Sequence, residues 1–130
     1  MRYIATLIIC LLTAFPAVAQ DMAKPSAAKR FLVMLEAPEK PTGINIMHNR
    51  VLRVTNPEGQ AIADAKIGVD GGMPAHGHGL PTSPQVTQYL GDGRYLIEGL
   101  RFNMSGKWQL KFSIDAAGQR DTAIIDFVLR

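Results

Sequence analysis

The chain contains a single cysteine among its 130 residues, and that residue, Cys10, lies inside an apolar run at the N-terminus. The run covers residues 4–12, follows the basic Arg2, and precedes the small-residue sequence AVA at 17–19, which is typical of a secretory signal. The run is too short to span a bilayer comfortably. We therefore expect residues 1–19 to be a cleaved signal peptide and the mature protein to be periplasmic, with no membrane span.

A mature chain without Cys10 has no thiol, which excludes a disulfide framework, a thiolate metal site and a cysteine nucleophile. The sequence also lacks a G-x-S-x-G elbow, a P-loop and a dinucleotide fingerprint. We therefore expect that the protein is not an enzyme. Loss of Arg2 leaves 13 basic residues against 11 acidic ones, and the basic residues are scattered. No basic stripe is present, so we expect no binding of nucleic acid.

Helical periodicity is absent as well, and what remains is a series of short apolar or alternating runs separated by turn signals. Residues 20–30 are polar and small, which predicts a flexible lead-in. Residues 31–130 predict one all-β domain, an immunoglobulin-like or cupredoxin-like antiparallel sandwich of about seven strands. Asp92-Gly93-Arg94-Tyr95 resembles the tyrosine corner of such sandwiches. The runs expected to form strands are 31–35, 50–55, 65–69, 85–90, 95–97, 108–114 and 123–129.

The candidate metal ligands are two histidines and two methionines. His76 and His78 lie in the Gly- and Pro-rich segment 71–84, and in an extended segment such i and i+2 side chains point the same way, about 7 Å apart. Met73 precedes them, and Met104 lies in a loop between two late strands. Thioether and imidazole together favour copper, as Cu(I) or Cu(II), over zinc. The leading hypothesis is a copper chaperone or buffer.

Two other interpretations stay open. The histidines, exposed in a Gly-rich loop, could bond local backbone groups, and the protein would then be a metal-free envelope module that docks on a partner protein. A second pair, Met47-His48, stands just before a strand and has no partner at ligand spacing, so we interpret it as structural or as part of the surface.

Four segments of the chain carry a family resemblance: AKIGV from Ala65, MPAHGHGL from Met73, GDGRY from Gly91 and MSGKWQL from Met104. Over roughly Arg50 to Ile114, the chain resembles the YtkA-like domain family and, more distantly, FixH-type domains. This resemblance implies an exported or membrane-anchored immunoglobulin-like sandwich. It also implies copper handling, with a membrane or periplasmic acceptor such as an oxidase-assembly protein as partner. The family-pattern positions are Met73, His76, His78 and Met104.

Overall fold

A computed structural model describes residues 20–130, so the interpretation of residues 1–19 as a leader lies outside the described part. The described residues form nine strands and one turn of 3₁₀ helix, and the expected all-β class is confirmed. None of them forms a helix with the length and apolar character needed to cross a bilayer. The elements are β1 (Met22–Pro25), β2 (Leu32–Leu35), β3 (His48–Thr55), β4 (Lys66–Met73), η1 (Pro74–His76), β5 (His78–Gly79), β6 (Gln85–Gly91), β7 (Arg94–Leu100), β8 (Gly106–Ala116) and β9 (Gln119–Leu129).

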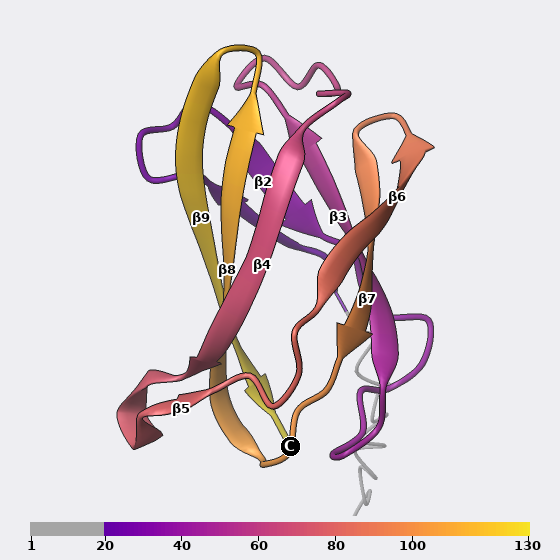
Figure 1. The fold of residues 1–130 in the computed structure, drawn as a ribbon, viewed down its shortest axis with the longest axis vertical. Helices are drawn as coiled ribbons and strands as arrows, with labels where there is room; N and C mark the ends of the chain where they lie inside the picture. Colours follow the sequence, from indigo (N-terminus) through magenta and orange to yellow (C-terminus); the bar gives the residue numbers. More distant parts are fainter. Residues whose placement is uncertain (1–19) are drawn as a thin grey trace, which may run out of the picture.

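The strands form two antiparallel sheets, in the orders β1-β2-β3-β7-β6 and β5-β4-β8-β9. Figure 1 shows β4, β8 and β9 side by side across β2 and β3. Without the short strands β1 and β5, the orders are those of the four-stranded and three-stranded sheets of an immunoglobulin domain. The predicted sandwich is thus confirmed, with two short strands added at sheet edges.

The core lies between the sheets and follows the alternation of the strands. On β8, Trp108, Leu110, Phe112 and Ile114 all point inward and are at most 1% exposed. Each such side chain contributes about 1.5–3 kcal/mol through its burial. The period-two pattern of residues 108–114 therefore predicted the inner face of this strand correctly.

The segment expected to be a flexible lead-in is instead ordered by the sandwich. Within residues 20–30, β1 pairs with β2, and Ser26 is buried. The Asp121 carboxylate accepts hydrogen bonds from the Ser26 hydroxyl and from the Ala28 amide. Burial of Asp121 raises its pKa, but the hydrogen bonds that it accepts outweigh burial and lower this pKa to about 2. The sequence of residues 20–30 does not reveal these hydrogen bonds because their acceptor, Asp121, lies far along the chain.

Tyr95 does not form a tyrosine corner in the expected place. It lies on β7, the fifth strand of the immunoglobulin order, whereas the corner belongs to the start of the sixth, which is β8 here. Its hydroxyl donates a hydrogen bond to the Ile62 carbonyl oxygen (2.6 Å) and accepts one from the Ala65 amide (3.1 Å). The hydroxyl of Tyr95 thus joins β7 to the connection between β3 and β4. Tyr95 shares with a tyrosine corner only this hydrogen bonding of its hydroxyl to backbone groups.

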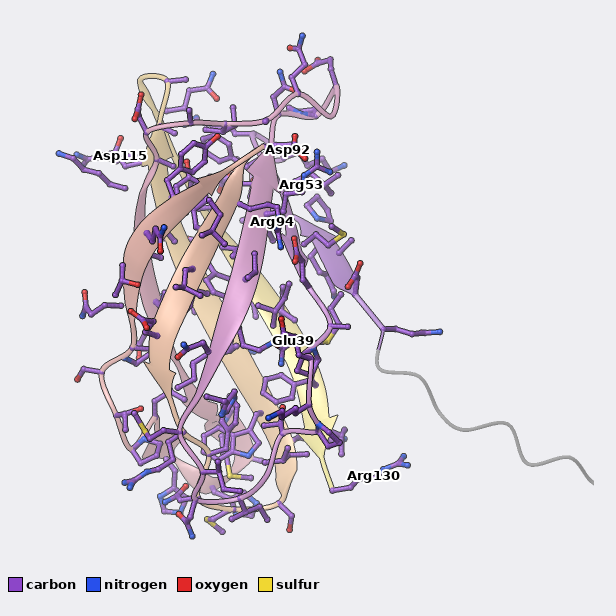
Figure 2. All side chains as sticks on the ribbon, turned by 90° about the vertical axis from the view of Figure 1, so that its right-hand side faces the viewer. Glu39, Arg53, Asp92, Arg94, Asp115 and Arg130 are labelled. Carbon is purple, nitrogen blue, oxygen red and sulfur yellow. The ribbon has the colours of Figure 1, made fainter. Side chains whose placement is uncertain are left out.

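The sandwich has an upper and a lower end, as oriented in Figure 1. The upper end carries the β3–β4, β6–β7 and β8–β9 connections, and the lower end carries the start of β3, the end of β4, η1, β5 and the β7–β8 connection (Figure 1). Figure 2 shows Asp92 and Asp115 toward the upper end and Arg130 at the lower end. All four predicted metal ligands lie at the lower end.

Candidate metal centre at the lower end

The glycine pair Gly71-Gly72 lies inside β4, although the sequence predicted that a loop begins at residue 71. A Cβ added at Gly72 would lie 2.1 Å from the His78 carbonyl oxygen, and one at Gly71 would lie 2.3 Å from the Gln109 carbonyl oxygen. The missing side chains let two neighbouring backbones approach β4 closely. As a result the strand continues to Met73, which belongs to a sheet rather than to a loop.

Met73 is therefore a core residue with no exposed surface, not the water-exposed loop ligand that the sequence predicted. A Cβ added at Gly106 would lie 2.9 Å from the terminal methyl carbon of Met73, so the thioether fills the space that this glycine leaves. Met73 is also the cross-strand partner of His78. Directly opposed residues of an antiparallel pair have Cβ atoms about 4.5–5.5 Å apart. The buried sulfur thus lies on the strand next to the exposed imidazole.

His76 and His78 converge, but through a different backbone from the expected extended segment. His76 ends η1, Gly77 takes the left-handed conformation (φ 62°), and His78 begins β5. Both histidines are exposed, and their ring centroids are 6.2 Å apart with an angle of 20° between the planes. A metal ion about 2 Å from a ring nitrogen lies roughly 3 Å from the ring centroid. The centroid separation is close to the largest that one ion can bridge, so the exposed rings must turn to aim one nitrogen each at a shared ion.

Met104 lies in the β7–β8 connection at the same end, and its side chain is 39% exposed. Its carbonyl oxygen accepts a 2.9 Å hydrogen bond from the Trp108 indole nitrogen, which fixes the backbone of the connection. Gly106, two residues later, faces the methyl group of Met73. The structure therefore brings Met73, His76 and His78 into one group and places Met104 in the adjoining loop.

Within residues 20–130, no three or more side chains of His, Cys, Asp or Glu gather in the way that holds a metal ion. The predicted ligands are imidazoles and thioethers, and this set suits copper better than zinc, calcium or magnesium.

His48 is the residue whose environment the sequence analysis missed. Its ring packs against Phe102 with centroids 5.2 Å apart, and its Nδ1 lies 3.2 Å from the Ile46 carbonyl oxygen. Its Nε2 is buried and has no hydrogen-bond partner. Burial lowers the pKa of His48, the Arg50 guanidinium lowers it further, and the bond to Ile46 acts in the opposite direction. The Met47-His48 pair was the available signal, but His48 contacts Phe102, which is distant in the sequence.

Comparison with known proteins identifies the family of this chain through one family model. No curated protein and no solved structure matches the chain. The family model described as YtkA-like matches residues 26–113, which include β2 to β7, most of β8 and the candidate ligands at the lower end. The chain therefore belongs to the YtkA-like family.

Proposed function

We propose that this protein binds copper at the lower end of the sandwich and acts as a copper chaperone or buffer in the periplasm. The observation that carries the proposal is the pair of exposed, stacked imidazoles of His76 and His78, with the thioether of Met73 on the neighbouring strand. A periplasmic or membrane-bound copper acceptor is the partner that this function requires.

The arrangement supports ion transfer as well as binding. The two imidazoles are exposed, so an ion reaches them from solution, and a ligand of an acceptor can replace them one at a time. Met73 is enclosed in the core and contacts the ion only if its side chain rotates toward His78. Methionine has three rotatable bonds, which permit this change of rotamer, and its soft sulfur favours Cu(I).

The test is a copper titration of residues 20–130, which contain the whole described core. Cu(I) affinity is measured by competition with a chromophoric chelator, and Cu(II) binding by quenching of Trp108, the only tryptophan. We expect His76→Ala/His78→Ala to weaken binding at this site by about 100-fold or more, since loss of even an outer-shell partner costs 10–100-fold. The matched control is Gln85→Ala/Gln88→Ala, which truncates two exposed side chains that belong to neither proposed copper site. Equal affinity of the double variant and the wild type would end this proposal.

A second function, docking on a partner protein without metal, is favoured by one observation at the same end. Four large apolar side chains are exposed on its loops, by 39–60% of their surface. An apolar patch of this kind is common in protein interfaces. A partner that binds wild type and the double histidine variant equally well, with a copper chelator present, would favour this function. The four residues are Ile44, Ile46, Met47 and Met104.

A further inference from the structure

Two loops at the lower end lie side by side and bring together residues that are distant in the sequence. The Asn45 amide donates a 2.7 Å hydrogen bond to the Phe102 carbonyl oxygen. Phe102 also packs its ring against His48. The segment 45–48 is thereby held against the β7–β8 connection, which contains Met104. The residues Met47, His48 and Met104 are called the Met47–Met104 group below.

A β-bulge sets the position of His48 at the start of β3. His48 pairs with Leu100 on β7, but Arg50 pairs with Ile97, so one extra residue of β7 faces Asn49. Gly99 supplies the left-handed conformation (φ 83°) within this bulge. Bulges commonly redirect a side chain next to a functional site. Here the bulge lies directly beside the imidazole that packs on Phe102.

The hydrogen bonding of His48 leaves one ring nitrogen free to act as a ligand. A carbonyl oxygen only accepts, so Nδ1 must carry the proton that it donates to the Ile46 oxygen. In the neutral ring, Nε2 then holds a lone pair, and this atom is buried without any partner. Metal-binding histidines almost always have this arrangement, in which one nitrogen donates to a carbonyl oxygen or carboxylate and the other binds the ion. A buried polar atom with no partner calls for an explanation, and a bound ion is one.

Two soft donors stand in the same two loops: Met47 directly precedes His48, and Met104 lies two residues after Phe102, against which the imidazole packs. Met47 is 56% exposed and Met104 is 39% exposed, so both thioethers are free to change rotamer. Thioether with imidazole is a donor set for Cu(I), and the group contains no carboxylate that would attract a hard cation. We propose that Met47, His48 and Met104 form a second site, specific for Cu(I), separate from the His76–His78 pair. Because Nε2 is buried, an ion reaches it only when neighbouring side chains move.

This site does not depend on the first one, and the experiment treats the two separately. The Cu(I) stoichiometry of residues 20–130 is measured by chelator competition, and Ag(I), a redox-inert analogue, is titrated while the methionine methyl resonances are followed. We expect two equivalents for wild type and one for His48→Phe, which keeps an aromatic ring against Phe102. The His76→Ala/His78→Ala variant should retain one equivalent, and the Met47 and Met104 methyl groups should still shift in it.

The control variant is Met34→Leu, which removes a thioether from β2 and should leave both equivalents in place. If His48→Phe folds poorly, Met47→Leu/Met104→Leu keeps the imidazole and should lose one equivalent. Two results would overturn the second site: no loss of stoichiometry in either variant, or Met47 and Met104 resonances that stay unmoved at saturating Ag(I). Neither result bears on the His76–His78 pair, whose failure would appear only in its own double variant.

Discussion

The two ends of the sandwich differ in whether their polar side chains are hydrogen-bonded. At the upper end, the Asp121 carboxylate and the Tyr95 hydroxyl each bond to backbone amides of other segments. At the lower end, His48 keeps a buried nitrogen without a partner, and the thioethers of Met47 and Met104 face solvent. Polar groups that serve only the fold are usually hydrogen-bonded, whereas functional sites often leave such groups without a partner.

One polar group at the upper end does not fit this difference between the ends. Thr55 Oγ1, toward the upper end of β3, is also buried without a hydrogen-bond partner. A threonine hydroxyl is neither a soft donor nor a strong ligand, and nothing else at that end gathers around it. Toward the lower end, the Nε atoms of Arg50 and Arg101 are also buried without a partner, but a guanidinium is cationic and cannot bind a metal ion. The His48 nitrogen differs from these three atoms because it has a lone pair and thioethers in the adjoining loops.

The largest expected effect comes from Phe102, which joins the lower end to the core. Its ring contacts those of His48, Trp108 and Phe127, and it is 1% exposed. We expect Phe102→Ala to lower the free energy of unfolding by about 3–5 kcal/mol. It should also abolish Ag(I)-induced shifts of the Met47 methyl group, since the loop loses its support. Urea denaturation and the methyl spectra measure both effects, and Phe102→Leu should cost less than half as much.

An intermediate effect is expected at the upper end from Tyr95→Phe. Burial raises the pKa of Tyr95, so its hydroxyl stays protonated and donates to the Ile62 carbonyl oxygen. Its removal leaves that oxygen and the Ala65 amide without a partner, at a cost of about 1–3 kcal/mol of unfolding free energy. Copper stoichiometry should remain unchanged. A loss of copper binding in this variant would show that the ends are not independent.

The smallest effect is a difference in pH dependence between the ends of the metal-free protein. The folded-state pKa of Asp121 is about 2, below its ordinary value of 3.8. Its contribution is therefore present above about pH 4 and is lost as the pH falls toward 2. The pKa of His48 is also lowered, from 6.5, because the folded state resists protonation of the ring. The unfolded chain then binds the proton first, so stability falls as the pH drops below 6.5.

Two variants separate these pH windows. Asp121→Asn should flatten the dependence of the unfolding free energy in the acid window and leave the region near pH 6 unchanged. His48→Phe should do the reverse. Denaturation midpoints measured from pH 7 to pH 2 test both, and a His48→Phe curve parallel to wild type between pH 7 and pH 5 would contradict the assignment of the lower-end window.

Much of the fold was predictable because its signals are local. The alternation along β8 identified which residues face the core, and the turn residues separated the strands. The predicted loop at residue 71 was wrong because a glycine pair usually marks a turn. Here Gly72 instead makes room for the carbonyl oxygen of His78. The lead-in at residues 20–30 was predicted to be flexible because its partner, Asp121, is distant in sequence.

For the site, the sequence by itself determined which chemistry was available: imidazoles and thioethers, and no cysteine thiol in the mature chain if the leader is removed. Only the tertiary structure decided how these groups are distributed. It enclosed Met73 beside Gly106, stacked His76 on His78 through a left-handed Gly77, and left Nε2 of His48 without a partner. The physical reason is that ligand identity is a property of single residues. Burial and pairing depend on which distant segments the sheets bring into contact.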